Sequence, residues 1–331
     1  MVISRILFLS TYDTTMDFEK LIKSHSLGNN VNHVRDGSHI RSEPKLTTTI
    51  MQQVSRHAKQ FSETSHESLS QMDELALTDT MKLIFNISKI YPDLAEAFSP
   101  SIPLILQIIS RMDITPKPLD GVIGCMINSL STLDIEIKKA ERFDVTSLFP
   151  ESNQSRNVNK LISILDLAVS TYNSQELETK AITLLQLLIV LYELAPESVR
   201  KEMQSLLLPE NSNRDLPIGH SDTLSSKLLN ISTTPYPNLK TIISELMFVL
   251  SGKNAEELTK NIGYGFAAGF LASRGMEIPQ TAGGTDSTGF DSAINPITGQ
   301  RFSAEPKDPG PPMTREEKER EAERLFVLFE R

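Results

Sequence analysis

One stretch decides the fold class of this chain, LETKAITLLQLLIVLY at residues 177–192. Its apolar residues recur at the i, i+4, i+7, i+8, i+11 and i+14 spacing of one helix face, at Leu177, Ala181, Leu184, Leu185, Leu188 and Leu191. Other apolar residues fill further faces, which indicates a helix covered on several sides. Similar patterns run over roughly 2–26, 70–91, 101–112, 117–132, 157–172, 197–208, 223–231, 237–251 and 254–274. No stretch shows the alternation of a half-buried strand, so the sequence predicts an all-α protein.

The order of these helices favours a solenoid over a closed bundle. The segments are short, follow one another in series and are separated by connections that contain Pro or Gly. The sequence also shows a weak internal repeat, because LIFN at 83–86 and CMIN at 125–128 end in Asn residues 42 positions apart. Armadillo and HEAT repeats have a period of about 40–47 residues. We therefore expect an armadillo/HEAT-like helical domain over residues 1–274.

Three further segments depart from the repeat. Residues 28–70 read as a polar insertion that holds four of the six histidines, and within it one side of an exposed helix is predicted at Leu46, Ile50, Val54, Ala58 and Phe61. Residues 275–312 read as a flexible linker, because 278–312 contain six Pro and five Gly. Residues 313–331 predict a tail helix that begins with a capping box at Thr314 and Glu317. Its apolar stripe, Ala322, Leu325, Phe326 and Phe329, must dock on the solenoid or on a partner.

Composition excludes several classes of function. The formal charge of −9 and the absence of any Lys/Arg stripe argue against a nucleic-acid binder. A single cysteine excludes an intramolecular disulfide framework. The apolar run at 6–9 is too short for a signal peptide, and the most apolar window, 181–192, is about half a membrane span. We expect a cytoplasmic protein without membrane insertion.

The candidate chemical groups give no catalytic site. The histidines lack metal-ligand spacing and are interpreted as surface residues, and Cys125 as a buried structural thiol. The run GYGFAAG at 263–269 is similar to a dinucleotide fingerprint, but that motif requires a preceding strand, and residues 256–262 predict a helix. We therefore expect no cofactor, no metal and no catalytic residues. An enzyme that uses the 263–269 loop remains a competing hypothesis, which the structure of that loop tests.

Asn86 and Asn128 are candidate functional residues because they are polar side chains at equivalent positions of the repeat. On the groove side of a solenoid they can bond the backbone of a bound peptide, with Lys82 one turn before Asn86. They can equally cap or bridge neighbouring helices. The sequence leaves both interpretations open.

Several motifs, taken together, resemble the synembryn family. They are RILFLST at 5–11, KLIFNI at 82–87, ELMFVL at 245–250, GYGFAAGFLASRG at 263–275, INPITG at 294–299, MTREEKE at 313–319 and the pair Leu325 and Phe326. The resemblance is collinear over nearly the whole chain. Family members carry further repeats before the segment that matches 5–11, so this chain is expected to begin inside the solenoid. Where animal members have an acidic, phosphorylatable segment, residues 281–291 contain only two acids, Asp286 and Asp291.

The resemblance implies a function without catalytic chemistry. Synembryns are cytosolic exchange factors and folding chaperones for G-protein α subunits, in which the groove takes the carboxy-terminal helix of the α subunit and the tail helix embraces its Ras-like domain. It implies a monomer that binds GDP-bound and nucleotide-free α subunits in the cytoplasm, including the cell cortex. The partner-binding residues expected in this chain are Lys82, Asn86, Asn128, Leu325, Phe326 and Phe329. The competing hypothesis is a generic armadillo/HEAT scaffold that binds another helix or peptide.

Overall fold

The computed structural model describes residues 46–63, 70–133, 145–209, 214–277, 295, 299–305 and 314–329. Every regular element of three or more residues within these ranges is a helix, which confirms the all-α prediction. The α-helices are α3 (Leu46–Glu63), α4 (Gln71–Ile90), α5 (Pro92–Phe98), α6 (Ile102–Arg111), α7 (Val122–Thr132), α8 (Arg156–Thr171), α9 (Ser174–Lys180), α10 (Ile182–Leu194), α11 (Glu197–Leu207), α12 (Leu224–Ser232), α13 (Pro237–Leu250), α14 (Ala255–Ser273) and α15 (Arg315–Phe329). Short 3₁₀ turns lie at Ser99–Ser101 and Val145–Leu148.

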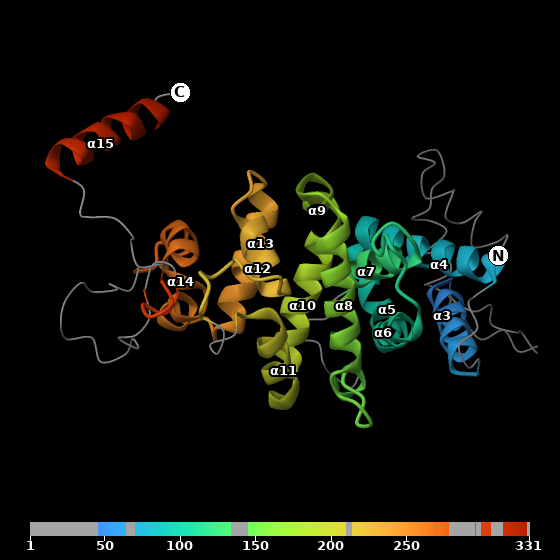
Figure 1. The fold of residues 1–331 in the computed structure, drawn as a ribbon. Coiled ribbons are helices and arrows are strands. Elements are labelled where there is room, and N and C mark those ends of the chain that lie inside the picture. The colour runs from blue at the N-terminus through green and yellow to red at the C-terminus, as the bar shows by residue number, and fades with distance from the viewer. Residues whose placement is uncertain are drawn as a thin grey trace, which may run out of the picture.

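The helices form two layers that run along the molecule. In one layer α4, α7, α10 and α13 are successive neighbours, and in the other α3, α6, α8 and α12 follow one another. The layers are joined by contacts of α3 with α4, α6 with α7, α8 with α10 and α12 with α13. Figure 1 shows this stack in chain order from α3 to α14, with α15 set apart from it. This arrangement is the predicted solenoid.

A continuous apolar core lies between the two layers. Each helix from α3 to α14 contributes apolar side chains that are almost inaccessible to solvent, such as Ile84, Ile105, Met126, Leu165 and Leu188, at 1% exposure or less. Burying a side chain of this size is worth about 1.5–3 kcal/mol. Helix α10 buries residues on several faces, as expected, because it packs against α7, α8 and α13 at once.

Two predicted helix boundaries are wrong. The helix expected from Leu177 onward is divided at Ala181 into α9 and α10. The helix expected from 117 begins only at Val122, because the N–H of Leu119 donates to the Tyr172 hydroxyl at 3.1 Å. The second correction comes from a contact with a residue distant in the sequence.

The helix predicted inside 28–70 exists, but the expectation that it is exposed is wrong. In α3, Ile50, Val54 and Ala58 are 4% exposed or less, since the helix packs on α6. His57 shares that face and is 1% exposed, so its interpretation as a surface histidine is also wrong. Burial is the main cause that lowers its pKa.

The described part of the predicted linker packs against the loop that precedes α12. Buried Arg214 donates from its guanidinium to the carbonyl oxygens of Lys260, at 2.9 Å, and of Gly299, at 3.3 Å. The amide of Arg301 donates to the carbonyl of Arg214, and Gln300 donates to that of Asp215. The segment 299–305 is thus fixed to the loop before α12.

Candidate functional site

The candidate site lies on the solvent side of the layer formed by α4, α7 and α10. We call this surface the amide face and define it by Lys82, Asn86, Asn128, Thr183 and Gln186. Asn128 and Gln186 are exposed, and the other three are half-buried. None of the five side chains lies in the core.

On α4, Lys82 and Asn86 are one helical turn apart and therefore point to the same side. Close by, the ammonium of Lys89 lies 5.2 Å from the centre of the Phe85 ring, a cation–π contact. The hydroxyl of Ser129 donates to the carbonyl of Met81 at 2.7 Å, which fixes α7 beside α4. This contact places Asn86 and Asn128 on adjacent helices of the same layer.

Asn128 bonds to the next helix of the layer. Its Oδ1 accepts a hydrogen bond of 3.0 Å from the hydroxyl of Thr183 on α10. Of the two interpretations left open by the sequence, the bridge between neighbouring helices is what the structure shows for the Asn128 oxygen. The partner-binding role of Lys82, Asn86 and Asn128 remains a prediction.

Cys125 lies one turn before Asn128 and is half-buried. Burial raises the pKa of its thiol, although the positive charge of Lys82 acts in the opposite direction. A thiol with a raised pKa is a poor nucleophile at neutral pH. This agrees with the interpretation of Cys125 as a structural residue, but the thiol is half-buried and not buried as expected.

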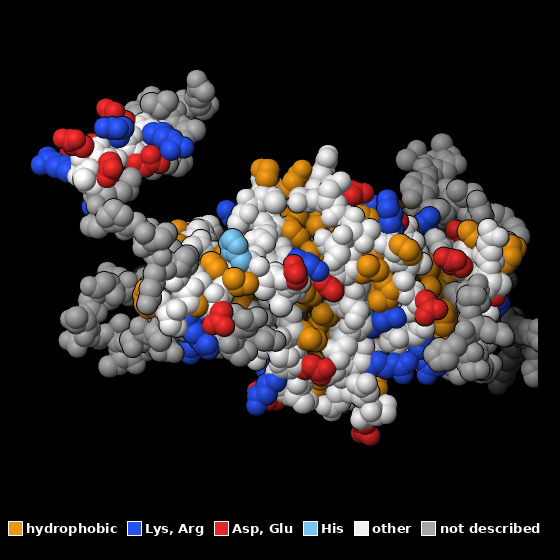
Figure 2. Space-filling model, in the orientation of Figure 1, with side chains coloured by type: hydrophobic (Ala, Val, Ile, Leu, Met, Phe, Trp, Pro, Cys, Tyr) orange, Lys and Arg blue, Asp and Glu red, His pale blue; other side chains and the backbone are white. Residues whose placement is uncertain are grey.

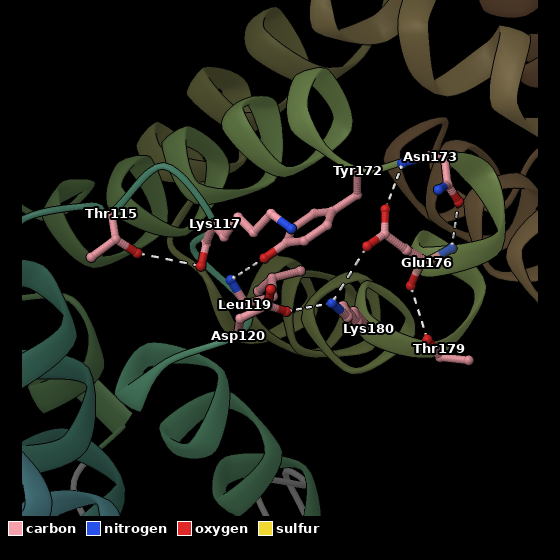
Figure 3. A network of polar contacts seen from close by, with 9 residues as sticks. All are labelled: Thr115, Lys117, Leu119, Asp120, Tyr172, Asn173, Glu176, Thr179 and Lys180. Atoms are coloured by element: carbon pink, nitrogen blue, oxygen red, sulfur yellow. Dashed lines mark hydrogen bonds and ion pairs between the residues drawn. The ribbon is translucent and has the colours of Figure 1, made fainter.

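A polar network at the start of α7 sets the position of that helix (Figure 3). Lys180 forms an ion pair with Asp120 and a weaker one with Glu176 at 3.8 Å, and its ammonium lies 4.6 Å from the centre of the Tyr172 ring. The hydrogen bond with Lys180 is the main cause that lowers the pKa of Asp120, and it raises the pKa of Lys180 in turn. The network therefore binds α9 to the loop that precedes α7.

The same short helix also reaches the start of α13. The carboxylate of Glu178 accepts hydrogen bonds from the backbone N–H groups of Asn238, at 3.2 Å, and Leu239, at 2.7 Å. These are amides that a helix cannot satisfy internally, and an acidic group is favoured at that end. The short helix α9 therefore links the loop before α7 to the start of α13. No pattern in the sequence predicted that Glu178 and Lys180 join these segments.

The glycine-containing run at 263–269 lies inside α14. Residues 255–262 are helical, and the helix bends at Gly263, which has φ of +78°. No strand precedes the run, so it lacks the strand–turn–helix context that a dinucleotide site requires. This observation contradicts the hypothesis of an enzyme that uses this loop.

The tail helix α15 begins with the predicted capping box. The hydroxyl of Thr314 accepts from the amide of Glu317 at 3.4 Å, and the Glu317 carboxylate accepts from the amide of Thr314 at 2.8 Å. Figure 2 shows charges of both signs along the described part of this helix, where Arg315 pairs with Glu319. The side chains of Leu325, Phe326 and Phe329 lie outside the described residues, so their docking stays a prediction.

Metal sites and membrane-spanning helices each have recognisable features. Within the described residues, no three His, Cys, Asp or Glu side chains come together in a group that could hold a metal ion. Across the same part of the chain, no helix is both long and apolar enough to cross a bilayer. On the face seen in Figure 2, acidic and basic side chains of the described residues are scattered among uncharged ones.

Comparisons with known proteins identify the family. The family model for Ric8, described as guanine nucleotide exchange factor synembryn, matches residues 1–331. The chaperone Ric-8A of Mus musculus is 33% identical over 146 residues, which are 40% of this chain and 27% of that protein. A synembryn-like chaperone of Schizosaccharomyces pombe is 24% identical over 278 residues, or 79% of this chain and 52% of that protein.

The matched region thus spans about half or less of the length of these relatives. The Ric-8A chaperone of Xenopus laevis is 36% identical over 126 residues, which cover 22% of its length. The family model nevertheless extends over this whole sequence, from Met1 to Arg331. The chain therefore belongs to the synembryn family.

Proposed function

We propose that this chain is a guanine nucleotide exchange factor and folding chaperone for heterotrimeric G-protein α subunits. The observation that carries the proposal is the match of the synembryn family model to residues 1–331. The two-layer helical stack supports it, because extended stacks of this kind present long surfaces to other proteins. The relatives in mouse and fission yeast are both named chaperones.

The proposed mechanism is thermodynamic linkage. A protein that binds the nucleotide-free α subunit more tightly than the GDP-bound form must weaken GDP binding by the same factor. A hundredfold preference would correspond to about 2.7 kcal/mol of coupling. Because the same preference stabilises a loosened, nucleotide-free chain against unfolding, exchange and chaperoning follow from one binding property. No residue of this chain has to touch the nucleotide.

Two parts of the chain would provide the contacts. Lys82, Asn86 and Asn128 would contact a docked segment of the α subunit through their polar groups. The apolar stripe of Leu325, Phe326 and Phe329 on α15 would form a second contact with the α subunit. A helix of 15 residues is marginal in isolation and becomes stable when an apolar stripe docks.

The remaining features of the proposal follow from this role. The protein would act as a monomer in the cytoplasm, including the cell cortex, and bind both GDP-bound and nucleotide-free α subunits. It would need no catalytic residue, cofactor, metal, nucleic acid or membrane insertion. A generic scaffold, the competing function, would show no dependence on the nucleotide state of its partner.

The test is to measure the affinity of the chain for a purified α subunit with GDP bound and with nucleotide removed. We expect tighter binding without nucleotide, and equal affinities would support the generic scaffold. Asn86→Ala should weaken binding several-fold with an unaltered circular dichroism spectrum. The matched control is Asn153→Ala, an exposed loop residue before α8, which should bind like the wild type.

A further inference from the structure

Thr183 lies in the first turn of α10, and its hydroxyl bonds to a side chain of the neighbouring helix α7. A helical Thr hydroxyl commonly donates to the carbonyl four residues earlier. In this protein Thr80, Thr241 and Thr259 do so, at 2.7–2.8 Å. Thr183 instead donates its proton across to Asn128 on the neighbouring helix, at 3.0 Å. Its proton is therefore used to fix a side chain that is itself exposed to solvent.

This bond decides which end of the Asn128 amide faces outward. A carboxamide is planar, with the oxygen and the NH₂ group on opposite branches. Since the oxygen is held at Thr183, the NH₂ group is directed away from that contact. Among the residues that the structure describes, no acceptor bonds to this NH₂ group. Two oriented donors are thus presented to whatever docks on the amide face.

The surroundings favour a neutral or negative acceptor. Helix α7 contains no charged residue, and the only one in α10 is Glu193 in its last turn, where it pairs with Lys253 at 2.5 Å. The charge that acts on Cys125, one turn before Asn128, is the positive charge of Lys82. Gln186, one turn after Thr183, adds an exposed amide on the same side.

We propose that Thr183 is a positioning residue, which aims the NH₂ group of Asn128 at a backbone carbonyl oxygen of the docked segment of the α subunit. The inference rests on the proposed function and assigns a role to a residue outside the predicted set. Thr183 itself need not touch the partner. Its effect passes through Asn128, which makes the two residues energetically coupled.

The test compares Thr183→Val, which keeps the shape and removes the hydroxyl, with Thr183→Ser, which keeps the hydroxyl. Binding of a nucleotide-free α subunit should weaken roughly two- to tenfold in Thr183→Val. It should return to within about twofold of the wild type in Thr183→Ser. Thr241→Val is the matched control, because this exposed threonine on α13 bonds only within its own helix. It should bind like the wild type.

A double-mutant cycle shows whether the effect passes through Asn128. Asn128→Asp keeps an oxygen for Thr183 but removes the donors, so it should bind at least as weakly as Thr183→Val. Adding Thr183→Val to Asn128→Asp should then cause no further loss. Normal binding by Thr183→Val, failure of Thr183→Ser to recover, or additive effects would each overturn the inference while leaving the proposed function intact. Failure of the wild type to bind any α subunit would overturn both.

Discussion

Gly124 lies where α7 passes the loop that precedes it, and the structure leaves no room there for a methyl group. A Cβ atom added at Gly124 would lie 2.1 Å from the carbonyl oxygen of Leu119 and 2.8 Å from its carbonyl carbon. The first distance is about 1.4 Å less than the ~3.5 Å at which nonbonded heavy atoms meet without repulsion. The atoms in the way belong to the backbone, so no rotation of a side chain relieves the clash. We therefore choose Gly124→Ala as a test of the packing.

The expected magnitude combines three effects. Overfilling a packed site costs about 1–3 kcal/mol. Displacing Leu119 also threatens its N–H hydrogen bond to the Tyr172 hydroxyl, worth about 0.5–1.5 kcal/mol. Against these, alanine is favoured over glycine inside a helix by about 1 kcal/mol. The free energy of unfolding should therefore fall by about 0.5–3.5 kcal/mol.

The assay is urea unfolding followed by far-UV circular dichroism, and Gly269→Ala is the matched control. Gly269 is also inside a helix, but a Cβ added there meets no atom within 4 Å. That control should stabilise the protein by about 0.5–1 kcal/mol. If Gly124→Ala stabilises the protein as much as the control does, the loop is not held against α7 at Leu119.

Three further predictions concern other parts of the chain. Gly299→Ala should release the segment 299–305, because Gly299 has φ of +67° and an added Cβ would lie 2.2 Å from Ile218. The Arg301 amide should then lose its protection from hydrogen exchange, and unchanged protection would contradict this prediction. Since burial lowers the pKa of His57 below 6.5, the unfolded chain binds the proton first, and stability should fall as the pH drops through 6.5. His57→Leu should reduce that loss in denaturation curves taken across this range, and an unaltered pH dependence would refute it. The double substitution of Phe326 and Phe329 by Ser should lower the affinity for the α subunit and leave the helical circular dichroism signal of the solenoid unchanged. Wild-type affinity of this variant would show that α15 does not contribute to binding.

The sequence was sufficient for the fold because helical periodicity is a local property. The spacing of Leu184, Leu188 and Leu191 predicts α10 without knowledge of its neighbours, and the capping box at Thr314 predicts the start of α15. Boundaries failed where distant residues decide them. The start of α7 depends on a bond between residues 53 positions apart, Leu119 and Tyr172.

The candidate site was predictable only in part, for the same reason. Asn86 and Asn128 could be selected because they recur in similar segments. Thr183 could not, since its partner Asn128 is 55 positions away and no pattern in a single sequence links the two. The burial of His57 was missed because the apolar side of α3, although predicted, was expected on an exposed helix, and its packing against α6 is a contact between distant segments.

The most direct test of the proposed function is the rate at which an α subunit releases fluorescently labelled GDP. The release is followed after excess unlabelled nucleotide is added, with and without the 331-residue chain. The linkage mechanism predicts that release accelerates with increasing concentration of the chain and reaches a plateau when the α subunit is saturated. A release rate that stays the same at concentrations where the chain demonstrably binds the α subunit would contradict the proposed exchange activity.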